Sequence, residues 1–544
     1  MANKLELTWY GKDEPIRVEP RLLIENTALS NTAADPDTQN MLIHGDNLLA
    51  LKALESKFAG QVKCIYIDPP FNTGQAFENY DDNLEMSIWL DLMRSRLQII
   101  HTLLKDDGTL FVHIDDQNLP YLTLLLDEIF GKQNRLYLIT FKQGAATGHK
   151  AINPGCVTTT NFILIYSKSK EHWHPNRLYT NRGSRDKRYG NFITNINDPF
   201  PSWNLITLTE AFAEERKLSI KEARAFIKSY PEQMDQFVLE HCESVIQLVN
   251  PDYNSVGAET RAMIDESRNK PNEILRQVRD GYSDIYLLNG KRIIFYRDKL
   301  KKVDGEYVPG EPLTTLWDDL LSNNLHNEGG VNFPKGKKPE ALIKRCIELS
   351  SDLGDIVLDS FLGSGTTAAV AHKMKRRWIG IEMGKQAYTH CKPRIDDAIA
   401  NNDASGITKS VDWQGGGGYR FYEVAPTLIN KDAFDEYVIN EDYDANMLAA
   451  AVALHEGFHY QPDGELFWKQ SVGNENSYLF VTTRHLNSTY LDSIKDTMED
   501  GEYLIILPAA PLTMDWTRLT TTLPSRKFRK CCWNAVSLAR PTTI

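Results

Sequence analysis

A short acidic, proline-rich segment carries the sharpest chemical signal in the sequence. Asp68, Pro69, Pro70 and Phe71 directly follow residues 62–67, an apolar run with the β-branched character of a buried strand. The prolines restrict the backbone, so that a carboxylate, a carbonyl and an aromatic ring are held side by side. A carboxylate and a carbonyl that accept both N–H groups of a base amine stabilise the charge that develops on its nitrogen, and the ring can stack on an extruded base. The alternative is a proline-rich strand end without chemistry.

A glycine-rich loop in the second half of the chain is a candidate nucleotide cradle. Gly363 and Gly365 follow a predicted strand and open a helix, and Glu382 ends the next predicted strand. Glycines let the backbone approach a ligand, and an acid at that place can accept the hydroxyls of a ribose. The pattern fits dinucleotide binders and S-adenosylmethionine binders alike. We assign to cofactor binding, in and around this loop, Asp359, Phe361, Gly363, Gly365, Thr366, Thr367 and Glu382.

Strands and helices alternate around both segments. The predicted elements are a strand at 62–67, a helix at 87–104, a strand at 109–114, a helix from Pro120, a helix from Pro339, a strand at 356–358 and a strand at 378–382. This alternation is typical of a mostly parallel twisted sheet with helices on both faces, so the sequence predicts a Rossmann-like α/β fold. Ligands of such sheets bind at the carboxyl ends of the strands, where both segments lie.

The length of 544 residues predicts roughly three or four domains. We divide the chain into an N-terminal segment (1–40), a half with the tetrapeptide (41–169), an insert (170–312), a half with the glycine loop (313–424) and a C-terminal α/β domain (425–544). The insert is expected to contain helices near 207–248 and a hairpin at 285–296 that turns on Asn-Gly. Because the C-terminal part carries no obvious catalytic group, we expect it to cap its own core or to bind another protein.

Basic residues cluster in one stretch of a chain whose net charge is −12. A DNA-binding protein needs a local positive surface, and the net charge of the whole chain need not be positive. Residues 168–188 form such a strip with interleaved aromatic residues, and its candidate phosphate contacts are Arg177, Arg182, Arg185 and Arg188. A solvated loop explains the strip equally well.

Other signals are assigned no catalytic or metal role. His455 and His459 match the zinc-protease pattern His-Glu-x-x-His, but Gly457 interrupts the helix that this pattern requires, so we expect no metal. His113, Asp115 and Asp116 end a predicted strand, where capping of the next helix is favoured over catalysis. The seven cysteines form no C-x-x-C pair, and the sequence has neither an apolar run of membrane length nor a secretory leader. These features predict a cytoplasmic protein.

The tetrapeptide and the glycine loop together make the chain resemble the amino-methyltransferases of DNA. Their order, with the insert between them, resembles the circularly permuted beta class, and the leading acid resembles the enzymes of adenine N6. The resemblance extends over most of the chain to the modification subunits of type III restriction-modification systems. It rests further on Met41-x-x-His44-Gly45-Asp46-Asn47, Trp89-Leu90, residues 104–108, Ile114-Asp115-Asp116, Lys338-Pro339-x-x-Leu342-Ile343, residues 415–423 and residues 478–483.

The resemblance implies methyl transfer from S-adenosylmethionine to the N6 amine of a flipped adenine in double-stranded DNA. It implies that Asp46 approaches the adenine of the cofactor and Lys338 its methionine carboxylate, while Asp68 belongs to both the catalytic and the cofactor-binding set. It also implies a homodimer, a possible restriction (helicase-nuclease) subunit as partner, and target recognition by the insert. Three alternatives remain: an adenine methyltransferase without a nuclease partner, a nicotinamide-dependent oxidoreductase, and a catalytically silent DNA-binding subunit.

Overall fold

The computed structural model describes residues 6–14, 17–72, 84–144, 155–320, 325–334, 336–435, 437–484, 486–508, 528–530 and 542–543. The chain divides into two units, of which one comprises Met1–Asn176 with Thr315–Ile544 and the other comprises Arg177–Thr314. Within the described residues, no helix is both long enough and apolar enough to cross a bilayer.

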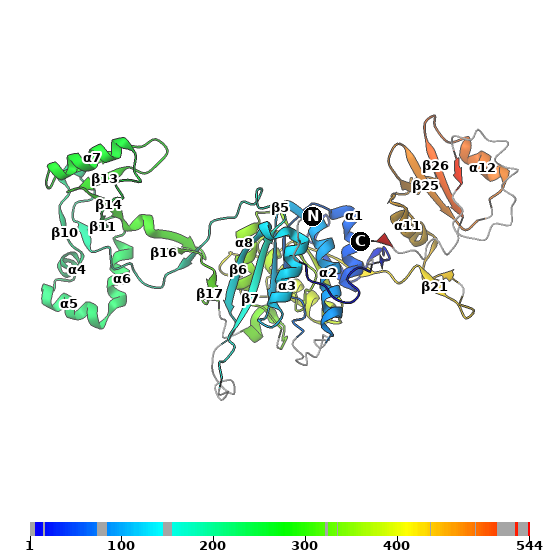
Figure 1. Ribbon diagram of the computed structural model, residues 1–544, viewed down its shortest axis with the longest axis horizontal. Helices are drawn as coiled ribbons and strands as arrows, with labels where there is room; N and C mark the ends of the chain where they lie inside the picture. Colours follow the sequence, from blue (N-terminus) through cyan, green and yellow to red (C-terminus); the bar gives the residue numbers. More distant parts are fainter. Residues whose placement is uncertain are drawn as a thin grey trace. The chain divides into compact units, whose positions relative to one another are not determined.

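A ten-stranded sheet forms the centre of the first unit (Figure 1). Its strands, in spatial order, are β17 (Leu316–Trp317), β6 (Arg135–Lys142), β7 (Thr160–Ser167), β5 (Leu104–Ile114), β4 (Val62–Ile67), β18 (Ile356–Asp359), β19 (Arg377–Glu382), β3 (Met41–His44), β20 (Arg420–Val424) and β2 (Leu23–Glu25). The strands from β5 to β20 are parallel to their neighbours, whereas β7 and β2 run antiparallel. The α/β fold class expected from the sequence is confirmed.

Helices bury the apolar sides of this sheet. They are α1 (Asn47–Phe58), α2 (Met86–Leu103), α3 (Leu119–Leu126), α8 (Glu340–Ser350), α9 (Thr366–Lys373) and α10 (Lys392–Ile399), with π-helical turns at Asp127–Gly131 and Ala387–Cys391. Every residue of β4 is buried, which explains why its sequence is a continuous apolar run instead of an alternating one. Ile65 and Leu358 on neighbouring strands and Trp89 on α2 belong to one fully buried core.

Strands from the two sequence halves alternate in the sheet and bring both chemical segments to one edge. Ile65 of β4 pairs with Leu358 of β18, and Glu382 of β19 pairs with His44 of β3. The pairs are parallel, so the segments that follow β4, β18, β19 and β3 all leave the sheet at its carboxyl edge. The tetrapeptide and the glycine loop therefore emerge from adjacent strands.

The second unit has its own antiparallel sheet and its own core. Its larger sheet has the order β10 (Leu205–Thr207), β9 (Asn191–Ile193), β11 (Val245–Val249), β14 (Lys291–Phe295), β13 (Ile285–Leu288) and β12 (Ile274–Gln277), and its smaller sheet has the order β15 (Leu300–Val303), β16 (Glu306–Pro312) and β8 (Tyr179–Asn181). Its helices are α4 (Leu208–Arg216), α5 (Ile220–Ser229), α6 (Pro231–Glu240) and α7 (Ala258–Asn269). The expected hairpin is present as β13 and β14, with positive φ angles at Asn289 and Gly290.

The last part of the chain contains a smaller sheet. Its strands are β23 (His459–Tyr460), β24 (Ser471–Val472), β25 (Ser477–Thr482), β26 (Tyr503–Pro508) and β27 (Phe528–Lys530), with α11 (Ala445–Glu456), α12 (Ser488–Lys495) and the hairpin β21 (Ile429–Lys431) and β22 (Tyr437–Ile439). At the chain ends, β1 (Arg17–Val18) pairs with β28 (Thr542–Thr543). Helix α11 ends at Glu456 because Gly457 adopts the left-handed conformation, with φ of 75°. His455 and His459 therefore do not share the face of one helix, which the zinc-protease pattern requires.

Candidate active site

Asp68 follows the last residue of β4 and is paired with a lysine from the other half of the sequence. Lys338 Nζ donates to Asp68 Oδ2 at 2.5 Å. The other carboxylate oxygen, Oδ1, is buried and has no hydrogen-bond partner. Burial raises the pKa of Asp68, and the neighbouring ammonium opposes this shift. The site thus holds a partly buried carboxylate with one oxygen paired to the lysine and the other buried without a hydrogen-bond partner.

The backbone of the tetrapeptide is fixed by two side chains. The indole N–H of Trp89 donates to the Pro70 carbonyl at 2.9 Å, and the Asn118 amide donates to the Phe71 carbonyl at 2.6 Å. Among the described residues, no donor contacts the carbonyl of Pro69. Of the carbonyls at Pro69, Pro70 and Phe71, the first is therefore the one that no described donor contacts.

The Phe71 ring stacks on His113, a residue for which the sequence favoured helix capping. The ring centroids are 5.8 Å apart with an interplanar angle of 18°. His113 is fully buried, with Nδ1 2.9 Å from the Tyr66 hydroxyl and Nε2 3.2 Å from the Asn161 amide nitrogen. Burial holds the pKa of His113 well below its usual range, so the ring is neutral. The capping interpretation is therefore wrong for His113, which packs against the Phe71 ring at the carboxyl edge of the sheet. The signal in the sequence that could have indicated this role is a polar residue in an otherwise apolar strand.

Asp115, at the same strand end, does not cap the following helix either, because α3 has no side-chain cap. Asp115 Oδ1 accepts a hydrogen bond from the backbone N–H of Asn118 at 3.3 Å, in the turn that precedes α3. Because Asn118 also donates to the Phe71 carbonyl, this turn holds the tetrapeptide in place. Asp116 is exposed.

Two acids brace the glycine loop. Asp359 accepts the Phe361 backbone N–H at 2.9 Å and the Thr367 hydroxyl at 2.6 Å. Glu382 accepts the backbone N–H groups of Gly363 at 2.7 Å and Gly384 at 2.9 Å. The acids at the ends of β18 and β19 therefore fix the conformation of the loop between them.

Asp359 shares the carboxyl edge with two other acids. Burial raises its pKa to about 7, and the charges of Asp68 and Glu382 contribute to the increase. Carboxyl groups crowded in this way favour a cationic ligand, because each added positive charge relieves their mutual repulsion.

Close packing at Gly365 leaves no room for a side chain. This residue has a φ of +82°, and a Cβ atom there would lie 3.0 Å from Cys391 Cα. The hydroxyl of the next residue, Thr366, accepts a hydrogen bond from Arg394 Nη1 at 2.7 Å. Arg394 also donates to Glu340 at 2.8 Å, and both side chains are fully buried. Thr366 and Thr367, assigned from sequence to cofactor binding, thus anchor the loop through their hydroxyls.

Asp46 begins helix α1 at the end of β3. Its Oδ1 caps the helix by accepting the backbone N–H groups of Leu48 and Leu49 at 2.8 and 3.2 Å, and its Oδ2 pairs with Arg96 at 3.3 Å. The adjacent Asn47 donates to the Ser360 carbonyl at 2.7 Å. The first sequence half is thereby tied directly to the glycine loop of the second.

The four arginines assigned to DNA lie in the second unit, and three of them form ion pairs. Arg182 and Arg188 lie 3.4 and 2.5 Å from Asp186, and Arg185 lies 3.2 Å from Asp235. Arg177 is exposed and lies over the Tyr179 ring at 5.5 Å. Asp186 is buried, and hydrogen bonds from Arg188 hold its pKa far below the usual range. Much of the positive charge of the predicted strip is therefore balanced within the unit.

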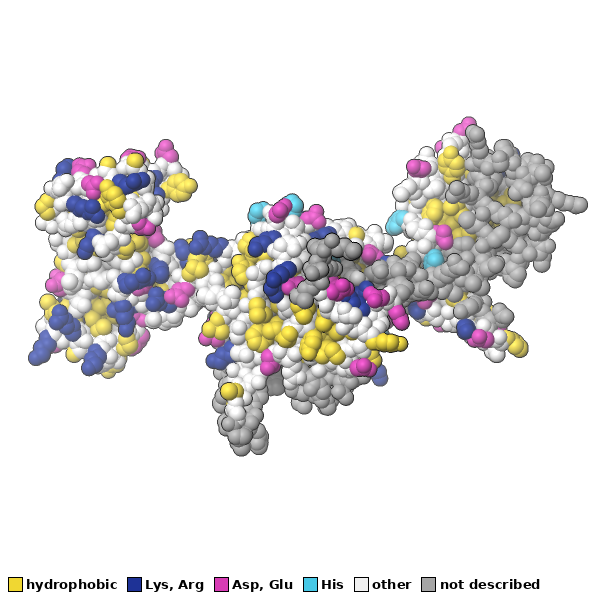
Figure 2. All heavy atoms as spheres, in the orientation of Figure 1, with side chains coloured by type: hydrophobic (Ala, Val, Ile, Leu, Met, Phe, Trp, Pro, Cys, Tyr) yellow, Lys and Arg dark blue, Asp and Glu magenta, His cyan; other side chains and the backbone are white. Residues whose placement is uncertain are grey.

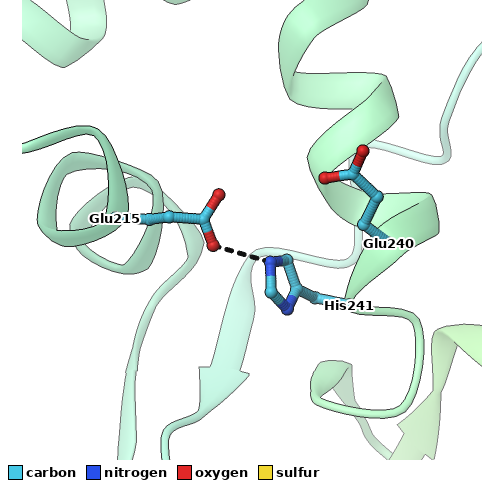
Figure 3. Close-up of side chains that lie close together, drawn as sticks. All are labelled: Glu215, Glu240 and His241. Atoms are coloured by element: carbon cyan, nitrogen blue, oxygen red, sulfur yellow. Dashed lines mark hydrogen bonds and ion pairs between the residues drawn. The ribbon is translucent and has the colours of Figure 1, made fainter.

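One group in the described residues has the composition of a metal site (Figure 3). Glu215, Glu240 and His241 offer ligand atoms within 4.8 Å of one another, but none of the three is buried. His241 Nε2 already lies 2.8 Å from Glu215 Oε2, as the dashed line in Figure 3 marks. Exposed carboxylates of this kind are common without an ion, and we assign no metal here.

Comparison with known proteins identifies the family. Residues 62–393 match the family model of N6/N4 enzymes described as DNA methylase. The chain is 35% identical over 429 residues to the "Probable type III restriction-modification enzyme HindVI Mod subunit" of Haemophilus influenzae, covering 75% of this chain and 56% of that protein. It is 28% identical over 360 residues to the type II methyltransferase M.EcaI of Enterobacter cloacae, covering 63% of this chain and 66% of the other.

A solved structure resembles the chain as well. TTHA0409 of Thermus thermophilus, crystallised with S-adenosyl-L-methionine, covers 71% of this chain and 99% of its own, with 14% identity and a TM-score of 0.33. The chain spans 56% and 66% of the lengths of the two relatives named above. The family match covers the tetrapeptide, the insert and the glycine loop. This chain belongs to the DNA methylase family of N6- and N4-specific enzymes.

Proposed function

We propose that this chain transfers a methyl group from S-adenosylmethionine to the N6 amine of an adenine flipped out of double-stranded DNA. The carrying observation is the buried Oδ1 of Asp68, which has no hydrogen-bond partner, next to the carbonyl of Pro69, which no described donor contacts, at the edge where the glycine loop also emerges. An acceptor pair of this kind suits an amine that donates two N–H groups. The acid in the first position favours adenine over cytosine.

The residues of the site divide the work as follows. S-adenosylmethionine, when bound, supplies a methyl group on a positively charged sulfur. Asp68 and the Pro69 carbonyl orient the amine, and Phe71 stacks on the extruded base. Once nitrogen gains the methyl group it must lose a proton, and Asp68 Oδ1 is positioned to accept it, because burial raises the pKa of this carboxyl. The proton then passes to water.

The carboxyl edge suits the cationic cofactor. Asp68, Asp359 and Glu382 place three carboxyl groups near one another, and burial together with the charges of the other two acids raises the pKa of Asp359 to about 7. Asp46, Lys338, Phe361, Gly363 and Gly365 complete the proposed cofactor set, with Thr366 and Thr367 anchoring the loop. Glu382 would exchange its bonds to backbone N–H groups for the ribose hydroxyls.

The biological setting that we propose is a type III restriction-modification system, in which this chain is the modification subunit in the cytoplasm. The name of the Haemophilus influenzae relative supports this setting. The insert, which forms most of the second unit, would read the target sequence of the DNA. A modification enzyme without a nuclease partner is the second candidate, which the similarity to the type II enzyme M.EcaI favours.

We further propose a homodimer, for which the first unit offers an apolar face. Figure 2 shows hydrophobic side chains gathered over α2, α3 and β6. The exposed residues on these elements are Ile88, Tyr121, Leu124, Tyr137 and Leu138. In light scattering at micromolar concentration, Leu124→Glu with Leu138→Glu should shift the mass from a dimer to 62.0 kDa. Leu353→Glu, at an exposed site on another element, is the matched control. A wild-type chain that is monomeric and active would rule out the dimer.

A partner subunit is tested by deletion of residues 425–544. If the truncated chain stays folded and methylates DNA but no longer retains a helicase-nuclease subunit, this part of the chain binds that partner. Aggregation of the truncated chain would instead indicate that the segment, which belongs to the first unit and packs Leu22 and Ile24 against its own core, is needed for the fold of that unit.

Asp68→Ala tests the proposed chemistry. The variant should lose methylation of DNA and should retain affinity for S-adenosylmethionine within a few-fold, because Asp68 faces the amine. Holding two reactants in line can supply roughly 7–11 kcal/mol through orientation alone, so the residual rate should be small without being zero. Calorimetry that shows a folded variant without cofactor affinity would refute the assignment.

A further inference from the structure

Two short helices of the second unit form a helix–turn–helix pair. Thr207 caps α4 and Ser219 caps α5, each through a capping box with the glutamate three residues later. The turn between them is made by Lys217, which has a φ of 55°, and by Leu218. Phe212 of α4 and Ala223 of α5 are buried in the core of the unit. Both helices are therefore well defined by their own sequence and anchored on one side.

The outer side of α5 carries a basic stripe. Lys221, Arg224 and Lys228 are exposed and recur at the spacing i, i+3 and i+7, so they lie on one face of the helix. Ala223, the buried residue of α5, lies on the opposite face. Arg216 at the end of α4 and Lys217 in the turn are exposed as well. Figure 2 shows Lys and Arg side chains over this part of the unit.

These five cations differ from Arg182, Arg185 and Arg188 of the predicted strip, because none of the five forms an ion pair with a described carboxylate. Among the described residues, no carboxylate lies within 4.0 Å of Arg216, Lys217, Lys221, Arg224 or Lys228. The nearby acids are engaged elsewhere: Glu210 and Glu222 close the two capping boxes, and Glu215 is bonded to His241 (Figure 3). The charge of the stripe is therefore available to an external anion.

We propose that the basic face of α5, together with Arg216 and Lys217, is the surface by which the second unit binds the phosphates of double-stranded DNA. The inference rests on the DNA substrate of the proposed function and deepens it by naming the contact helix. A ten-residue helix is about 15 Å long, and the major groove, about 12 Å wide, admits one α-helix between two phosphate strands. In helix–turn–helix proteins the second helix of the pair takes that place.

The test is DNA binding by the full chain over a range of salt concentrations, measured by fluorescence anisotropy of a labelled duplex. Lys221→Gln, Arg224→Gln and Lys228→Gln together should lower the affinity about tenfold or more and should reduce the slope of log K against log salt by about 2.7, since each phosphate contact contributes about 0.9. The triple variant Lys221→Arg, Arg224→Lys, Lys228→Arg keeps all charges and should behave like the wild type.

A matched control neutralises three cations of the same unit that already have acidic partners. Arg268, Lys270 and Arg276 pair with Asp265, Glu266 and Asp284, and replacing the three by glutamine changes the net charge equally. This control should keep most of the slope. If both triple variants lose affinity equally, or if the α5 variant keeps the wild-type slope, the proposed surface is wrong.

Two further outcomes separate this inference from the proposed function. All variants should keep wild-type affinity for S-adenosylmethionine, which reports on the first unit alone. If the wild-type chain methylates DNA and the α5 variant binds DNA normally, the proposed DNA-binding surface is wrong, whereas the proposed methyltransferase function stands. Preference of the wild-type chain for single-stranded RNA over duplex DNA, or absence of both DNA binding and methylation, would overturn the surface together with the proposed substrate.

Discussion

Lys338 Nζ lies 2.5 Å from Asp68 Oδ2, and this contact joins residues from the two sequence halves at the edge of one sheet. The resemblance to known enzymes had suggested the methionine carboxylate as the target of Lys338. The structure gives the lysine a second task, which is to oppose the rise in the pKa of Asp68 that burial causes. The same ammonium lies 5.4 Å from the centroid of the Phe71 ring.

Lys338→Met should therefore change the pH dependence of methylation. Without the ammonium, burial of Asp68 is no longer opposed, and its pKa rises further. Asp68 accepts hydrogen bonds through both oxygens only when it is ionised, so activity should be lost at a higher pH as the medium is acidified. The measurement is kcat between pH 5 and 9, with Lys338→Arg as the control that keeps the charge. If kcat falls at the same acidic pH in Lys338→Met and in the wild type, the ion pair with Lys338 does not set the ionisation of Asp68.

Binding of the cofactor should release a proton from Asp359, because the pKa of this carboxyl lies near neutrality. Its pKa of about 7 leaves about half of the carboxyl groups protonated at pH 7, and a cationic ligand favours the ionised form. Binding of S-adenosylmethionine at that pH should release up to about half a proton. Calorimetry in buffers of different ionisation enthalpy measures the release, which Asp359→Asn should abolish. A binding enthalpy that does not depend on the buffer in the wild type would contradict the prediction.

Phe71→Ala should weaken capture of the target base by about 1–3 kcal/mol, the usual contribution of stacking between a base and an aromatic ring. A duplex with 2-aminopurine at the target position brightens when that base leaves the stack, so its fluorescence reports capture. His113→Ala should give a smaller loss in the same assay, because it removes the ring on which Phe71 stacks. His113→Phe keeps a ring at this place and should lie closer to wild type. Unchanged capture in Phe71→Ala would refute the stacking role.

Arg188→Gln should affect the stability of the second unit more than its binding to DNA. Arg188 holds the pKa of the buried Asp186 far below its unfolded value, so the pair stabilises the fold at neutral pH. The stabilisation by this pair is fully present above about pH 4, near the pKa of an unfolded aspartate. It is lost as the pH falls through the lowered pKa of Asp186. The thermal midpoint of Arg188→Gln should lie below that of wild type at pH 7, with a smaller difference below pH 4. Lys187→Gln, at an exposed residue, is the control; equal midpoints for all three proteins at pH 7 would contradict this role.

The sequence predicted those parts of the site whose chemistry is local. Asp68 to Phe71 and Gly363 to Gly365 could be proposed from sequence because their residue types act through their own backbone and follow apolar runs that form strands. The mostly parallel sheet was expected from the alternation of strands and helices, whereas its ten-stranded order comes from the structure. The partner of Arg185 and the second partner of Arg182 could not be predicted, because Asp235 and Glu311 lie far away in sequence and meet the arginines only in the fold. The strip of basic residues therefore overstated the free charge.

His113 illustrates the other limit of prediction from sequence. A histidine at the end of a strand is ambiguous on its own, and its role follows from Tyr66 and Phe71 in one segment and Asn161 in another, both distant in sequence. The basic stripe on α5 was missed for a related reason. Its cations are interleaved with glutamates in sequence, and only the capping boxes and the Glu215–His241 bond show that these acids are engaged.

The most direct test of the central claim is the identity of the methylated base. Double-stranded bacterial DNA is incubated with the purified chain and isotopically labelled S-adenosylmethionine, digested to nucleosides, and analysed by mass spectrometry. The account predicts label in N6-methyldeoxyadenosine, and only a small residual amount with Asp68→Ala. Label confined to N4-methyldeoxycytidine, or no label from a folded chain that binds both the cofactor and DNA, would contradict it.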